Sequence, residues 1–132
     1  MKYMLMMVGP RKDWDEMATS WSAEDIKANV RFMEEFNNKL VESGELVDAQ
    51  GLTGPEQAKV VQAQPSGQPV VTDGPFPETK EFLAGYWIVD VESEERAIEI
   101  AGQASASPGR GGAPAQVPVE VRPIGEAPSI DT

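Results

Sequence analysis

The chain has 132 residues, an apolar share of 40% and a formal net charge of −11 from 22 acidic and 11 basic residues. These values suit one domain with one modest core, and the negative charge argues against nucleic-acid binding through a basic surface. Because the sequence has no Cys and no His, disulfides, thiolate metal sites and histidine general bases are excluded.

The sequence also carries no signal that directs it to a membrane. No apolar run approaches the ~18 residues that a membrane helix needs. The opening MKYMLMMVGPRKDWDE lacks the long apolar stretch and the small-residue cleavage site of a signal peptide. We therefore expect a cytoplasmic protein with no membrane partner.

The first elements are a predicted strand and a predicted loop. Residues 2–8 form an apolar run that ends at Gly9-Pro10, which is typical of a strand buried on both faces. Residues 11–21 are polar and are expected to form a loop folded back on the core. In this loop, Trp14 and Trp21 cover either a cleft or only the edge of the sheet.

A long amphipathic helix is predicted next. Ser22 and Asp25 have the spacing of a capping box, with Asp in place of the usual Glu. Gly44 is well placed to follow the last turn, which gives a helix of about 20 residues. The predicted apolar stripe comprises Ile26, Val30, Met33, Phe36 or Asn37, and Leu40.

The second half of the chain predicts short strands around one further helix. A hairpin-like excursion from the sheet edge is predicted from segments within 45–52, 58–64 and 70–72. The segment GYWIVDV, residues 85–91, is predicted to form a central strand. Ser93 caps a helix from Glu94 to about Ala104. After a loop rich in Gly and Pro, residues 117–124 form the last strand, and the tail 125–132 is expected to be loosely held.

The resulting order is β-α-β-β-α-β, which predicts one ferredoxin-like α+β domain over residues 1–132, with two layers. Val117, Val119 and Val121 should lie under the helices, with Glu120 and Arg122 on the opposite face. The first and third strands are apolar on both faces, so helices on one side leave apolar side chains uncovered. We therefore expect a homodimer that packs its sheets face to face around a two-fold axis.

One stretch resembles a known family. Asp73-Gly74-Pro75-Phe76, followed by Glu78, Lys80-Glu81 and Gly85-Tyr86-Trp87, is similar to the DGPF branch of the YCII-related proteins. The opening KYMLMM and the closing VEVRPI extend the resemblance over essentially the whole chain. It implies a dimeric α+β barrel and an occasional genetic association with extracytoplasmic sigma factors. Some members resemble enzymes with a His–Asp pair in a cleft; Asp73 fits the Asp position, and no His exists for the other.

The candidate site residues are Asp73, Glu78, Lys80, Tyr86, Glu120 and Arg122. Asp73 either stabilises an Asx turn, in which its carboxylate accepts hydrogen bonds from backbone N–H groups, or acts as a general base beside the cleft that the resemblance implies. Arg122 and Glu120 form a structural pair or line a site in which Arg122 holds an anion. Lys80 forms a solvated pair with Glu78 or holds an anion. Tyr86 packs in the core or interface, or contacts a ligand.

Several functions remain open at this stage. The first is binding or transformation of a small organic acid or ketone, by proton transfer or hydrolysis, in a cleft at the dimer interface. The second is a non-enzymatic accessory to transcriptional regulation, and the third is a cofactor-free oxygenase. The segment PGRGGAP lacks the Lys-Ser/Thr ending of a nucleotide loop. No metal and no cofactor are expected, and Phe76 is expected to plug the core.

Overall fold

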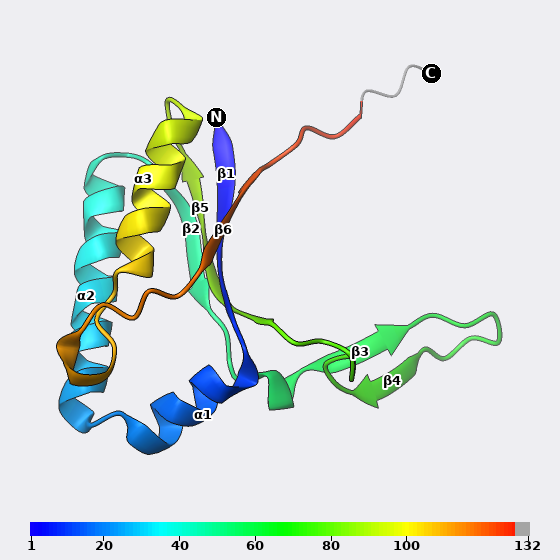
Figure 1. The fold of residues 1–132 in the computed structure, drawn as a ribbon. Coiled ribbons are helices and arrows are strands. Elements are labelled where there is room, and N and C mark those ends of the chain that lie inside the picture. Colours follow the sequence, from blue (N-terminus) through cyan, green and yellow to red (C-terminus); the bar gives the residue numbers. More distant parts are fainter. Residues whose placement is uncertain (129–132) are drawn as a thin grey trace.

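The computed structural model describes residues 1–128, and its main feature is a four-stranded antiparallel sheet in the order β2-β5-β1-β6. The strands are β1 (Lys2–Gly9), β2 (Leu46–Gly51), β5 (Phe82–Asp90) and β6 (Val119–Pro123). Helices α2 (Ala23–Glu42) and α3 (Glu94–Ser105) lie against one face of the sheet (Figure 1). This arrangement confirms the predicted ferredoxin-like α+β fold.

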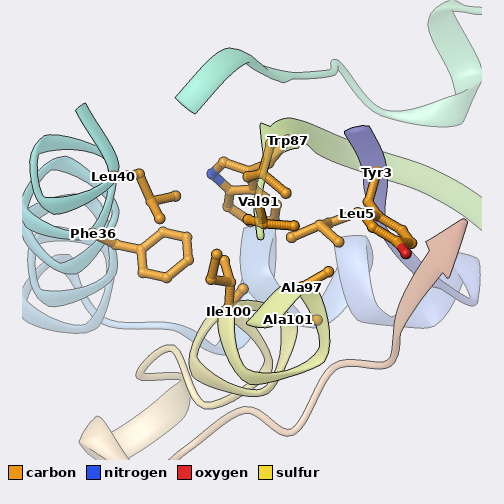
Figure 2. Close-up of a cluster of buried hydrophobic side chains, with 11 residues drawn as sticks. Tyr3, Leu5, Phe36, Leu40, Trp87, Val91, Ala97, Ile100 and Ala101 are labelled. Carbon is orange, nitrogen blue, oxygen red and sulfur yellow. The ribbon is translucent and has the colours of Figure 1, made fainter. Parts of the chain in front are cut away.

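The core lies between that face and the two helices. Figure 2 shows Phe36 of α2 and Ile100 of α3 directed toward Trp87 of the central strand β5. The Phe36 and Trp87 rings meet edge to face, with centroids 5.5 Å apart. The Trp87 indole N–H donates to Asn37 Oδ1 at 2.8 Å, so the polar end of this buried ring is satisfied.

Helix α2 begins with the predicted capping box. The Asp25 N–H donates to Ser22 Oγ at 3.1 Å, and the Ser22 N–H donates to Asp25 Oδ2 at 3.0 Å. The predicted apolar stripe is only partly right. Ile26 and Val30 are 44% and 51% exposed, because the face of α2 that meets the sheet carries Phe32, Met33, Phe36 and Leu40.

The predicted loop over residues 11–21 is wrong, because α1 occupies Arg11–Ser20. Pro10 takes the N-cap position and Asp13 lies in the first turn, where the helix dipole favours a carboxylate. No residue of α1 is buried, so the segment lacks the strong apolar periodicity by which helices are recognised. Trp14 anchors it by an edge-to-face contact with Phe82, at a centroid distance of 6.2 Å.

The middle of the chain forms an arm, defined here as residues 59–73. Strands β3 (Lys59–Gln62) and β4 (Val70–Asp73) pair as a separate two-stranded sheet after a 3-10 turn at Pro55–Gln57. The predicted excursion is therefore right for 58–64 and 70–72 but wrong for 45–52, because β2 pairs with β5 at the edge of the main sheet. The arm projects from the end of the main sheet on the side away from the helices (Figure 1). Val61 and Val71, which are register partners, are 61% and 58% exposed.

The last strand and the tail complete the description. Val119 and Val121 pack toward the core as expected, whereas Val117 precedes the strand. Phe76, expected to plug the core, is 60% exposed, because the loop that carries it leaves the sheet with the arm. Residues 125–128 form no helix or strand, and the rest of the predicted loose tail, 129–132, lies outside the described residues. Across residues 1–128, no helix combines the length and apolarity that a membrane crossing requires.

Candidate functional site

The face of the main sheet opposite the helices, here called the open face, presents two rows of four residues. Strand register aligns Asp48, Ile88, Met4 and Arg122 in one row, and Gln50, Tyr86, Met6 and Glu120 in the other. The two central strands therefore contribute apolar or aromatic side chains, and the two edge strands contribute polar ones. This pattern is that of a surface with an apolar centre and a polar rim.

Three of the sequence-predicted site residues share this open face. Met6 lies between Tyr86 and Glu120 in their row, and Arg122 lies in the adjacent row. Tyr86 donates its hydroxyl to Asp48 Oδ2 at 3.1 Å, and this hydrogen bond to a carboxylate raises the pKa of Tyr86. The hydroxyl of Tyr86 is thus already hydrogen-bonded to a residue of the neighbouring edge strand, β2.

The other three predicted residues lie outside the open face. Asp73 ends β4, with a side chain that is 88% exposed and ion-paired with Lys59 across the arm. Glu78 and Lys80 are exposed in the segment that joins β4 to β5. Within residues 1–128, no hydrogen bond or ion pair connects Asp73 to Glu120 or Arg122. The glycine after Asp73 is required by close packing, since a Cβ at Gly74 would lie 2.7 Å from Val60 Cγ2.

A pocket of about 350 Å³ opens on the helix side of the molecule. Its walls come from the end of β1, from α1, from the first half of α2 and from the segment 107–117, which precedes β6. The apolar part of the lining comprises Met7, Met17, Trp21, Met33, Ala113, Pro114, Ala115 and Val117. The polar part comprises Asp13, Glu16, Asn29, Ser107 and Arg110.

The outer wall of this pocket is fixed by hydrogen bonds to α2. Asn29 Nδ2 donates to the Pro108 carbonyl at 2.9 Å, and the Gly111 N–H donates to Asp25 Oδ1 at 3.0 Å. The same Asp25 belongs to the capping box, and the pKa of its carboxyl is lowered, first by the backbone hydrogen bond from Ser22. Gly111, with φ +69°, supplies the left-handed conformation of this turn.

Ser107 is the most deeply placed polar residue of the pocket. It is 2% exposed and lines the pocket, and among the described residues no buried side-chain nitrogen or oxygen lacks a hydrogen-bond partner. Its hydroxyl can both donate and accept hydrogen bonds. The described residues hold no cluster of three or more Asp or Glu side chains that could bind a metal.

Sequence reasoning missed most of this pocket. Asp13, Glu16 and Met17 follow the three- and four-residue spacing of one helix face, a signal that the expected loop over 11–21 concealed. Trp21, which was expected to cover a cleft at the dimer interface or the edge of the sheet, lines this helix-side pocket. Ser107 and Arg110 lie in a Gly- and Pro-rich segment, whose path depends on contacts with α2 that no local pattern encodes.

The fold, the open face and the helix-side pocket define a ferredoxin-like α+β protein that carries a concave site on its helical layer. Residues 1–120 match the model of the YCII-related domain, and the chain belongs to that family. It is also 36% identical over 122 residues to an uncharacterized protein of Rhizobium meliloti (strain 1021), covering 87% of this chain and 93% of the relative. The assignment to the DGPF branch stays a prediction.

Proposed function

We propose that this YCII-related protein binds a small organic molecule in the pocket between α1, α2 and segment 107–117. Ligand sites are typically concave, mostly apolar and furnished with a few polar groups, with volumes of roughly 300–1,000 Å³. The pocket of about 350 Å³ has this composition. The observation that carries the proposal is the pocket itself, whose mostly apolar lining includes a few polar side chains.

The chemistry open to such a site is limited by the absence of His and Cys. Within the lining, Asp13 and Glu16 are the carboxylates available to act as a general base. If the protein transforms its ligand, we propose that one of these carboxylates performs the proton transfer. A purely accessory protein is the alternative, and it would be indifferent to changes in the pocket.

A ligand screen with a filled pocket tests the proposal. We expect some members of a small-molecule library to raise the thermal unfolding temperature of the wild type, since a ligand that binds only the native state stabilises it. Ala115→Phe should abolish these shifts, because its ring would occupy pocket volume next to Ser107. Ala106→Phe, at an exposed position outside the lining, should retain them. Equal shifts in all three proteins would contradict the proposal.

The open face supports a second proposal, that two copies pack their sheets together. The arm extends from the sheet on the same side as this face (Figure 1), so a second copy on the face would also lie beside the arm. In such a dimer, Arg122 and Glu120 border a cleft between the two sheets, and Asp73, Glu78 and Lys80 lie at its end. Light scattering after size exclusion should give twice the mass of one chain; a monomer at micromolar concentration would refute it.

A further inference from the structure

The charges that face the pocket are unequal in sign. Asp13 and Glu16 project from one face of α1, and both line the pocket. Arg11 and Lys12 belong to the same helix but are not part of the lining. Within the described part of the chain, no ion pair neutralises either carboxylate. The α1 side of the pocket is therefore a region of negative potential.

The lining contains one cation, Arg110, which lies on the α2 side of the pocket and offsets only part of the negative charge. Arg110 lies next to Gly111, whose N–H is bonded to Asp25 Oδ1 at 3.0 Å. The guanidinium is close enough to Asp25 to contribute to the lowered pKa of that carboxyl. The lining therefore contains two carboxylates and one guanidinium, which leaves it with a formal charge of −1. The chain as a whole, with a net charge of −11, further favours a cation over an anion.

The remaining lining suits the body of an organic cation. Trp21 follows the last turn of α1 as its C-cap residue and is half-buried. An indole face attracts a cationic nitrogen through the quadrupole of the ring. Met7 and Met33 offer flexible, polarizable side chains that adapt to an irregular apolar body. The hydroxyl of Ser107 can accept a hydrogen bond from an ammonium N–H.

We propose that the pocket selects organic cations: an ammonium nitrogen lies between Trp21 and the carboxylates of Asp13 and Glu16, and an apolar body packs on Met7 and Met33. This inference rests on the proposed binding function of the same pocket and names the class of ligand. The ammonium donates N–H hydrogen bonds to carboxylate or Ser107 oxygens. No covalent step is involved.

Three probes of similar size and different charge test the inference: cyclohexylmethylamine, cyclohexylmethanol and cyclohexanecarboxylate. Titrations at pH 7, followed by calorimetry or tryptophan fluorescence, should give an amine affinity about ten-fold above that of the alcohol, with the carboxylate weakest. The amine affinity should also fall as salt concentration rises, because salt screens the charges. Amine and alcohol affinities that agree within two-fold would overturn the inference.

Variants assign the effect to the named residues. The double change Asp13→Asn and Glu16→Gln should weaken amine binding about ten-fold and leave alcohol binding unchanged. Glu34→Gln with Glu35→Gln removes the same charge from exposed positions outside the lining, and it should leave the amine preference intact. An equal loss in both double variants would overturn the assignment, because a long-range field would then explain it.

The aromatic contribution has its own control. Trp21→Leu should reduce amine affinity several-fold, and Trp21→Phe should restore most of it, since a phenyl face also attracts cations. Circular dichroism establishes that each variant is folded. If the wild type binds the alcohol but binds the amine no more tightly, the result refutes the cation class and leaves the proposed binding pocket intact. Failure of the pocket itself is read from the separate screen with Ala115→Phe.

Discussion

Glu45 and Arg96 form the best-enclosed charge pair among the described residues. Arg96 Nε and Nη2 donate to the two carboxylate oxygens of Glu45, each at 2.9 Å, and Ser43 Oγ donates to Oε1 at 2.8 Å. The Glu45 side chain is 16% exposed. The hydrogen bonds from Arg96 are the main reason that the pKa of Glu45 is lowered. The pair joins the start of β2 to α3.

We predict that Glu45→Gln lowers the free energy of unfolding by about 2 kcal/mol at pH 7, since charge-assisted hydrogen bonds are lost. Because the folded-state pKa of Glu45 lies below its ordinary value of 4.5, its contribution is fully present above that pH and is lost as pH falls through the lowered pKa. Urea unfolding from pH 7 to about pH 2.5 should show the difference shrinking. Glu42→Gln, at an exposed position, is the control; a difference that grows in acid would contradict this account.

Asp73 shows how far a residue can be understood from its sequence neighbours. The Asp-Gly-Pro-Phe run predicted a turn, and the chain does leave β4 at this point. The ion pair with Lys59 could not be predicted, because it depends on the register of two strands fourteen residues apart. Whether Asp73 serves a site stays a prediction that a dimer structure would address.

We predict that Asp73→Asn changes the free energy of unfolding by less than about 0.5 kcal/mol, because exposed ion pairs contribute little. The side chains of Asp73 and Lys59 are both largely exposed. Chemical denaturation of Asp73→Asn, Lys59→Gln and the double variant would measure the coupling between the two residues. A loss of 1–2 kcal/mol in Asp73→Asn alone would support a structural role for its carboxylate in the turn.

At the scale of elements, the strength of the local signal decided what the sequence revealed. Helix α2 was predicted from its capping box and its length, and both are present. Helix α1 was missed because its ten residues bury no side chain. The exposed side chains of Ile26 and Val30 show that hydrophobic spacing finds a helix more reliably than it finds the buried face. The missed helix is also the one that supplies Asp13 and Glu16 to the pocket.

The start of α2 links helix stability to the pocket, since Asp25 both closes the capping box and accepts from Gly111 N–H. We predict that Ser22→Ala lowers the free energy of unfolding by about 1 kcal/mol through loss of the cap. Amide exchange in segment 107–117 should also accelerate, because Asp25 is held less firmly against Gly111. The control Ser20→Ala, two residues earlier in α1, should change neither the free energy of unfolding nor the amide exchange of segment 107–117. Unchanged amide exchange in 107–117 would show that loss of the cap does not affect the pocket wall.

At the scale of the whole molecule, the sheet order and the side of the helices followed from alternation and element order. Val119 and Val121 face the helices, and Glu120 lies on the other side, as the two-residue period requires. The projection of the arm could not be derived, because short strands with alternative partners do not specify direction. An isolated two-stranded hairpin is marginally stable in water, so the arm benefits from any partner beside the open face.

The proposed dimer gives the last prediction. Ile88 lies in the central part of the open face, between Asp48 and Met4, and a lysine there would place two like charges close to the two-fold contact. We expect Ile88→Lys to raise the dimer dissociation constant at least 100-fold, because unpaired charges would be buried. Ile98→Lys makes the same change at an exposed position on α3 and should leave the dimer intact.

Salt provides an independent check on the same association. Each copy carries a net charge of −11, so two copies repel one another over a distance set by the Debye length, about 30 Å at 0.01 M and 3 Å at 1 M salt. Because the centre of the open face is apolar, salt should screen the repulsion without weakening the contact. Sedimentation velocity should therefore show tighter dimers as salt rises from about 0.02 M to 0.5 M. Dimers that dissociate with added salt would point to contacts made by charged rims instead.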